Sequence, residues 1–202
     1  MARYTGPRVK KMRSLGINLP GLSRKSMDKR PYPPGQHGKV GRRKLTEYGR
    51  RLLEKQKLRV NYGLTERQLR NTMSAAKSSK LDTGIKLLEL LERRLDNVVF
   101  RAGFAATIPA ARQLINHGHI TVNGRRVDIP SYTVNQGDLI RPREKTAKKA
   151  FVLEAVKSPS LIRPNWMSFD EAEMTATVMT LPDAVPFPVE IQYVIEFYAK
   201  SL

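Results

Sequence analysis

The apolar residues in the middle of the chain recur at helical spacing and predict an amphipathic helix. Six of them fall on one helix face, namely Leu88, Leu91, Leu95, Val98, Val99 and Ala102. Gly103 follows directly, where a glycine often ends a helix in the left-handed conformation. The pattern therefore predicts one helix that ends at Gly103.

A second short helix is predicted immediately afterwards. Thr107 can cap its N-terminus, and Pro109 suits its first turn, where a missing backbone N–H costs little. Its apolar face would consist of Ala111, Leu114 and Ile115. Gly118 can close the helix, so two short helices are expected to meet across a tight corner.

The pattern then changes from helical to alternating, which predicts a β-hairpin. Residues 120–122 alternate between apolar and polar, and Asn123-Gly124 offers the positive φ angles of a two-residue turn before residues 125–127. A second turn at Gly137-Asp138 leads into Leu139-Ile140. A small sheet is therefore expected after the helix pair.

Further helices are predicted upstream of this region. Thr46 can cap a helix that runs towards Gly63, and Thr65 with Gln68 forms a possible capping box for a helix over 66–76. Residues 82–84 interrupt the helical pattern and mark the start of a third helix. These elements predict a small helical domain.

Downstream, Phe151–Val156 could be a strand or a helix, whereas Trp166 and the alternating residues 174–179 suggest added strands. The predicted fold class is α+β: a basic extended N-terminal arm, a small helical domain, and a second domain with a helix-turn-helix-like pair on a small, mainly antiparallel sheet. The expected boundaries are 1–45 for the arm, 46–91 for the helical domain, joined by 189–202, and 92–188 for the second domain.

The distribution of charge suggests a polyanionic partner. The formal net charge is +19; residues 1–60 hold 18 Lys and Arg against 3 Asp and Glu, whereas residues 151–202 hold 3 against 7. The basic front has too little apolar surface for a core, so we expect it to order on phosphates, with Tyr4 and Tyr32 available for stacking. The alternative is a disordered, solubilising tail.

Several classes of protein are disfavoured. The chain has no cysteine, which excludes disulfides and thiolate metal sites. No run approaches the roughly 18 apolar residues of a membrane span, so a soluble protein is expected. A transit peptide is an alternative for the acid-free stretch before Asp28, although its glycines and prolines would interrupt the amphipathic helix of such peptides.

An enzyme would need a set of catalytic groups, and the sequence offers none. It has no phosphate-cradling Gly-x-x-x-x-Gly-Lys loop, no paired metal-binding histidines on a helix and no nucleophile elbow. His117 and His119 supply two nitrogens without a third ligand, which is poor metal coordination. We therefore expect no catalytic residue, no metal and no cofactor. The alternative is an RNA-modification factor that uses this region as a targeting module.

Basic and polar side chains gather in the predicted helix pair and hairpin. They are Arg94, Arg101, Arg112, His117, His119, Asn123, Arg125 and Arg126. Guanidinium groups suit phosphate oxygens, and neutral donors reach sugar hydroxyls and base edges. From this stretch alone, an RNA-binding surface and an ordinary solvated face are equally good interpretations.

A family resemblance favours RNA. The motifs that carry it in the centre are Arg94-Leu95-Asp96, Ala111-Arg112-Gln113-Leu114-Ile115, Gly118-His119-Ile120 and Val122-Asn123-Gly124. They resemble the RNA-binding module named after the fourth protein of the bacterial small ribosomal subunit. Outside it, the matching stretches are 33–38, 54–59, 62–63, 66–68, 129–132 and 194–198. With these, the sequence resembles that ribosomal protein family over nearly its whole length.

The resemblance implies a structural protein that binds the 5′ domain of small-subunit ribosomal RNA early in assembly, in cytoplasmic ribosomes of a bacterium or in an organelle. The implied RNA contacts outside the residues above are Arg3, Tyr4, Arg8, Lys10, Lys11, Arg13, Lys55, Lys57, Arg59 and Gln113. Lys55, Lys57 and Arg59 are expected on the exposed side of the helical domain. Ile108-Pro109-Ala110 replaces charged residues of many relatives, so Arg112 is the preferred anchor.

The resemblance also implies two further partners. Arg42, Arg43 and Lys44 fall where the family presents basic residues to messenger RNA entering the subunit. Glu47, Tyr48, Glu196 and Tyr198 fall in the region that faces the fifth small-subunit protein, an interface that influences decoding accuracy.

Overall fold

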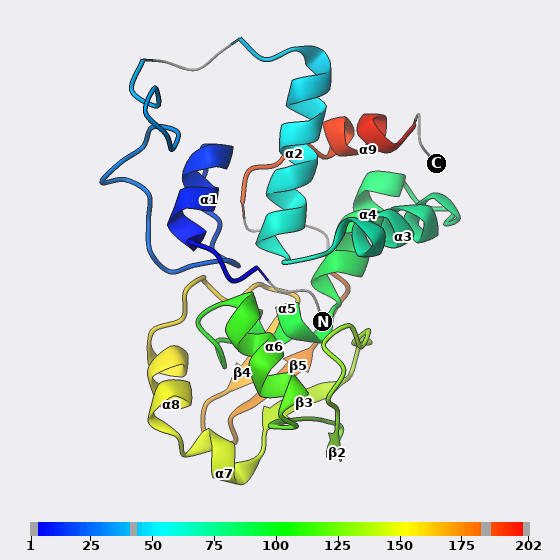
Figure 1. Cartoon of the computed structure of the whole chain (residues 1–202). Helices are drawn as coiled ribbons and strands as arrows, with labels where there is room; N and C mark the ends of the chain where they lie inside the picture. The colour runs from blue at the N-terminus through cyan, green and yellow to red at the C-terminus, as the bar shows by residue number, and fades with distance from the viewer. Residues whose placement is uncertain (1–3, 41–43, 183–186, 200–202) are drawn as a thin grey trace. The chain divides into compact units, whose positions relative to one another are not determined.

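The computed structural model describes residues 4–40, 44–182 and 187–199, and the predicted α+β class is confirmed (Figure 1). The chain divides into two compact units. Unit 1 combines Met1–Leu87 with Phe187–Leu202, and unit 2 is Leu88–Pro186. Within the described ranges, no helix combines the length and the apolar character that crossing a membrane requires.

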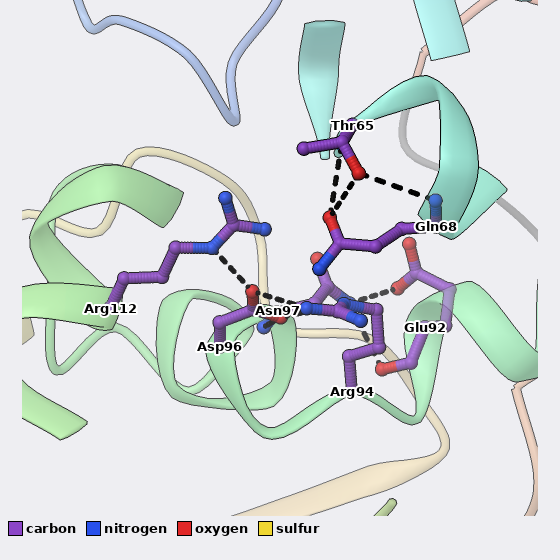
Figure 2. A network of polar contacts seen from close by, with 7 residues as sticks. All are labelled: Thr65, Gln68, Glu92, Arg94, Asp96, Asn97 and Arg112. Carbon is purple, nitrogen blue, oxygen red and sulfur yellow. Dashed lines mark hydrogen bonds and ion pairs between the residues drawn. The ribbon is translucent and has the colours of Figure 1, made fainter. Parts of the chain in front are cut away.

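Unit 1 is helical, and its helix starts follow the predicted caps. The elements are α1 (Arg8–Leu15), α2 (Glu47–Asn61), α3 (Glu66–Lys77), the first half of α4 (Thr83–Glu92), and α9 (Ile191–Ala199). The Thr46 hydroxyl accepts a hydrogen bond from the Gly49 N–H, and Thr65 and Gln68 form the predicted capping box (Figure 2). Helix α9 packs along α2, so the end of the chain completes the unit.

The N-terminal segment differs from the extended arm that was expected. Its residues 8–15 form α1, and the apolar side chains of Met12, Leu15, Leu19 and Leu22 are buried. The Gly21 N–H donates to the Asn61 side chain at the end of α2, over 3.0 Å. The expectation of too little apolar surface was wrong here, because a few side chains suffice when α2 supplies the rest of the core.

Unit 2 contains a five-stranded antiparallel sheet in the order β2-β1-β3-β5-β4. Its strands are β1 (Ile120–Val122), β2 (Arg125–Arg126), β3 (Leu139–Pro142), β4 (Met167–Asp170) and β5 (Thr175–Val178). Its further helices are α5 (Leu95–Arg101), α6 (Ile108–Asn116), α7 (Glu144–Ala147) and α8 (Ala150–Lys157). The ambiguous stretch at 151–156 is therefore helical, and the strand expected within 174–179 is present.

The helix predicted from 88 to 103 is in fact two helices, so that prediction was wrong. Helix α4 ends at Glu92, and Arg94 is extended, with ψ of 135°, before α5 begins. Arg94 forms an isolated antiparallel bridge with Thr133, and the Leu95 N–H donates to the Tyr132 carbonyl over 2.9 Å. Hydrogen bonds to a segment nearly 40 positions away replace the helical ones, and periodicity does not report them.

The short connections of unit 2 follow the sequence signals. Gly103, at φ of 89°, ends α5, and the Thr107 hydroxyl caps α6 by accepting from the Ala110 N–H. Asn123 and Gly124, at φ of 50° and 77°, form the two-residue turn between β1 and β2. The turn fixes the register of β1 and β2, and therefore decides which side chains share a face.

Candidate nucleic-acid interface

Asp96 is the centre of a buried polar network that orients two arginines (Figure 2). Its side chain is 1% exposed. Arg94 donates to both carboxylate oxygens, over 3.1 and 3.0 Å, and the Nε of Arg112 donates to Oδ2 over 2.6 Å. The backbone N–H of Asn97 is a further donor, at 2.9 Å. One carboxylate from α5 therefore fixes guanidinium groups at the start of α5 and on α6.

Arg101 belongs to a second buried network rather than to the surface. It is 7% exposed and its Nε lies 3.3 Å from a carboxylate oxygen of Glu92, which is fully buried. The side-chain amide of Asn97 donates to the backbone carbonyl and the carboxylate of the same glutamate, each over 3.0 Å. The sequence grouped Arg101 with the surface cations, and the structure places it in the core.

Cations line one face of the sheet in unit 2. Thr121 on β1 lies opposite Arg126 on β2 and Arg141 on β3, and directly paired residues share a face. His119 precedes Thr121 by two residues and Arg143 follows Arg141 by two, so both lie on that face too. The opposite face carries the buried Ile120, Val122 and Ile140. We call His119, Thr121, Arg126, Arg141 and Arg143 the cationic face.

The cationic face is not neutralised within the described residues. Arg126, Arg141 and Arg143 are exposed, and none of the ion pairs found in the described ranges involves them. Arg141 and Arg143 were not among the predicted site residues. The alternation of residues 139–143 would have placed them on one face, once the register with β1 was known.

Two histidines sit at the edge of this face. The rings of His117 and His119 lie 6.0 Å apart, and Nδ1 of His119 is 3.0 Å from the Thr146 hydroxyl. Burial lowers the pKa of His119, and the positive charges of Lys149, His117, Arg143 and Arg126 lower it further. Burial and the neighbouring cations therefore act in the same direction on this imidazole.

The other predicted contacts in unit 2 differ in their freedom to bind. Gln113 on α6 and Arg125 on β2 are exposed. Asn123 is exposed too, but its amide donates to Asp138 over 2.8 Å and accepts from the Leu139 N–H over 2.8 Å. Asn123 therefore holds the hairpin against β3.

The lysines of α2 are more occupied than expected. Lys55 is 4% exposed; its Nζ donates to Glu66 over 2.9 Å and lies 4.3 Å from the centre of the Phe197 ring. Lys57 pairs with Glu54 over 2.5 Å. The expectation that these residues line an exposed side was wrong for Lys55, because α9 covers that side of α2.

Arg59 is half-buried, and its Nε donates to the Gln56 side chain over 3.0 Å.

In the N-terminal segment, Tyr4 is 49% exposed, Lys10 is exposed and Lys11 is half-buried. Arg8 and Arg13 are half-buried, and their guanidinium groups donate to backbone carbonyls of Leu22 and Tyr32.

Lys44 is exposed, while Arg3, Arg42 and Arg43 lie outside the described residues. Groups of acidic residues and histidines that could hold a metal ion are not found in the described ranges.

The four residues expected at a protein interface divide into surface and interior. Tyr48 is 63% exposed, and Glu47 is exposed. Glu196 on α9 is half-buried and accepts from the Nε of Arg51 over 2.7 Å. Tyr198 is 2% exposed and donates to Glu66 over 2.6 Å, so it stabilises the docking of α9 from inside.

Comparison with known proteins gives the family. Residues 3–92 match the ribosomal protein S4/S9 N-terminal domain, and residues 93–140 match the S4 domain. The chain is 56% identical over 205 residues to small ribosomal subunit protein uS4 of Methylobacillus flagellatus, with both chains covered completely. The chain belongs to the small ribosomal subunit protein uS4 family.

Other uS4 relatives align at similar length. Small ribosomal subunit protein uS4B of Nitrosomonas europaea is 53% identical, with both chains fully covered. The uS4 protein of Listeria monocytogenes is 48% identical over 202 residues, covering 99% of this chain and all of the relative. The uS4-family chain is thus a ribosomal protein of the small subunit with an RNA-binding S4 domain, and α5, α6, β1, β2 and the start of β3 lie within that domain.

Proposed function

We propose that this uS4-family chain is a structural protein that binds the 5′ domain of small-subunit ribosomal RNA directly and helps to start assembly of the subunit, without catalysing a reaction. The observation that supports RNA binding most strongly is the cationic face. Its residues His119, Thr121 and Arg126 lie in the S4-domain match, Arg141 and Arg143 follow directly after it, and its exposed arginines make no ion pair among the described residues. Such a surface leaves positive charge available for phosphates.

The arrangement suggests how the surface distinguishes RNA by shape. Arginines on β2 and β3, the two strands that flank β1, are held at fixed spacing by the sheet register, and Arg94 and Arg112 are held by Asp96. Fixed cations match phosphates only where the backbone of the RNA follows the right path. Arg112 and Gln113 on α6 extend the proposed surface beyond the sheet, and the exposed Arg125 on β2, which pairs with Val122, adds a cation on the opposite face of the sheet.

The experiment that tests this proposal measures binding to a transcript of the 5′ domain and to a scrambled RNA of equal length across a salt series. Wild type should keep its preference for the true sequence as salt rises, because local contacts persist when counterion release contributes less. Equal affinity for both RNAs at every salt concentration would contradict the proposal.

A double variant, R126A with R141A, connects this test to the cationic face. We expect it to bind the 5′ domain roughly tenfold or more weakly, since neither position could then donate a charge-assisted hydrogen bond to a phosphate. The control is K77A with K80A, which removes the same charge from exposed positions at the end of α3 and just beyond it. An equal reduction in affinity in both double variants would indicate general electrostatic attraction.

We also propose that Arg42, Arg43 and Lys44 contact messenger RNA where it enters the subunit. The support is the sequence of three consecutive cations, of which Lys44 is exposed. Ribosomes carrying alanine at all three positions should unwind structured messages more slowly, with assembly largely unchanged. Unwinding at the wild-type rate would contradict the proposed contact with messenger RNA.

The surface around Glu47 and Tyr48 is proposed to contact a neighbouring ribosomal protein, the fifth of the small subunit, and to influence decoding accuracy. The support is a large exposed aromatic side chain, since Tyr48 is 63% exposed next to Phe197, at 5.8 Å between ring centres. Cross-linking from position 48 in assembled subunits tests the partner, and a product with any other protein would contradict the proposal.

A further inference from the structure

His119 occupies a distinctive position at the edge of the cationic face, because charged groups from several elements surround it. His117 approaches from the end of α6, Arg126 from β2, Arg143 from the end of β3 and Lys149 from the start of α8. Helix α7, which supplies Thr146, also carries the exposed Glu144 and Lys145. Among the described residues, no ion pair involves His117, Arg126, Arg143 or Lys149.

The backbone at the end of α6 is shaped to admit one of these cations. Gly118 has φ of 68°, and a Cβ placed there would overlap the guanidinium group of Arg126. The guanidinium of Arg126 therefore lies directly against the glycine, beside the imidazole of the next residue. A side chain at position 118 would occupy that space.

Thr146 allows His119 to exist in either protonation state without losing its hydrogen bond. The Thr146 side chain is buried, and its hydroxyl lies 3.0 Å from Nδ1. A hydroxyl can donate to an unprotonated Nδ1 or accept from a protonated one. No other hydrogen bond of the His119 ring is found among the described residues, so Nε2 is available for a ligand.

We propose that His117, His119, Arg126, Arg143 and Lys149 form a binding site for one phosphate group of RNA, and that filling this site is coupled to uptake of a proton by His119. This inference rests on the proposed RNA-binding function and adds a location, a ligand group and a dependence on pH. A phosphate supplies the negative charge that the cluster lacks, and a protonated Nε2 donates to it as a charge-assisted hydrogen bond.

The sign of the coupling follows from the neighbours. In the free protein, burial and the neighbouring Lys149, His117, Arg143 and Arg126 hold the pKa of His119 below its ordinary value of 6.5. A bound phosphate offsets those charges and raises the pKa of the imidazole. Between the two pKa values, binding takes up a proton, so RNA affinity increases as pH falls and decreases as pH rises through that interval.

The experiment measures affinity for the 5′ domain transcript at fixed ionic strength between pH 8 and pH 6. For wild type we expect affinity to rise on acidification with a slope of at most about tenfold per pH unit, the limit for one proton. In H119Q the slope should be smaller than in wild type, because one of the two histidines of the site is removed. The matched control is H37Q, which changes the one histidine outside the cluster, and it should retain the wild-type slope.

A second measurement follows the pKa of His119 by NMR with and without the RNA. A higher pKa in the complex supports the proposal even if the H119Q variant folds poorly. An unchanged pKa, or a wild-type pH dependence in H119Q, would overturn it. These outcomes differ from failure of the proposed function, in which wild type would show no preference for the 5′ domain at any pH.

Discussion

At the scale of single residues, Asp96 connects the core of unit 2 to its surface. Its carboxylate is buried, yet it accepts from two guanidinium groups that are 12% and 13% exposed. Removing this carboxylate would leave two largely buried guanidinium groups without their shared acceptor. Asp96 therefore supports the fold and keeps Arg94 and Arg112 in fixed directions.

Replacing Asp96 with alanine should lower the free energy of unfolding by about 3–5 kcal/mol, the usual cost of removing one partner from a buried ion pair. Urea unfolding followed by circular dichroism measures this value. D128A is the control, because Asp128 is an exposed carboxylate of the same unit. A difference between the two variants of less than about 1 kcal/mol would mean that the Asp96 network contributes little.

The hydrogen bond between Tyr198 and Glu66 gives a second prediction, on pH. Burial raises the pKa of Glu66, but hydrogen bonds from Tyr198 and Lys55 outweigh this and hold it below the ordinary value. A depressed carboxylate pKa stabilises the fold above the pKa of the unfolded chain, near 4.3, and this stabilisation disappears as pH falls through the folded value. The stabilising effect should therefore be complete at pH 7.

Y198F should thus lower the unfolding free energy by about 1–2 kcal/mol at pH 7 and by less at acidic pH, as pH falls through the folded pKa of Glu66. Urea midpoints at the two pH values provide the measurement. Y193F changes a half-buried tyrosine on the same helix and serves as the comparison. An effect of Y198F that is independent of pH would assign its role to packing alone.

At the scale of elements, local signals and long-range contacts determined different parts of the structure. Helix caps at Thr46, Thr65 and Thr107 and the turn at Asn123-Gly124 depend on neighbouring residues, and all could be read from the sequence. The break at Arg94 could not, because the competing hydrogen bonds come from residues 130–134. Tertiary partners decide such positions, and a single sequence does not show them.

The candidate site divides in the same way. Basic residues could be selected from the sequence as candidates for RNA contact. However, Arg101 is buried because it pairs with Glu92, and Lys55 is buried because α9 covers it. Arg141 and Arg143 became members of the cationic face only through the register of β1 with β3. Residue chemistry therefore selected the candidates for RNA contact, while the packing decided which of them are accessible.

The junction of α6 with β1 gives a prediction at this scale. G118A should destabilise by about 1–2 kcal/mol, the cost of a left-handed conformation in a residue with a Cβ, and it should also displace Arg126. G137A is a closely matched control: its φ is 87° and nothing lies near its Cβ position. A similar decrease in stability is expected in both variants, measured by thermal unfolding.

Only G118A should weaken binding to the 5′ domain, because only there does the added methyl group occupy the position of a proposed RNA contact. Equal RNA affinity of the two variants would show that Arg126 can relocate without cost.

At the scale of the whole molecule, the uneven charge predicts how salt affects binding. Residues 1–60 carry a large positive excess, and Lys10, Lys25, Lys29 and Arg30 are exposed among the described residues. Substituting these four with glutamine should reduce the slope of log affinity against log salt by about 0.7–0.9 for each phosphate that the protein no longer neutralises. Filter binding across a salt series measures the slope.

The same variant should retain its preference for the 5′ domain over scrambled RNA, since the cationic face is unchanged. Loss of that preference would place sequence discrimination in the N-terminal segment.

The division of unit 1 into two stretches of sequence has a consequence for synthesis. Arg51 and its partner Glu196 are 145 positions apart, and unit 2 lies between them along the chain. A polypeptide that emerges N-terminus first exposes all of unit 2 before α9 exists. Unit 2 can therefore fold during translation while α2 still lacks Phe197 and Glu196, and α3 still lacks Tyr198. Unit 1, whose first stretch is synthesised before unit 2, is therefore the last unit to complete its folding. It can do so only after α9 has left the ribosome that synthesised the chain.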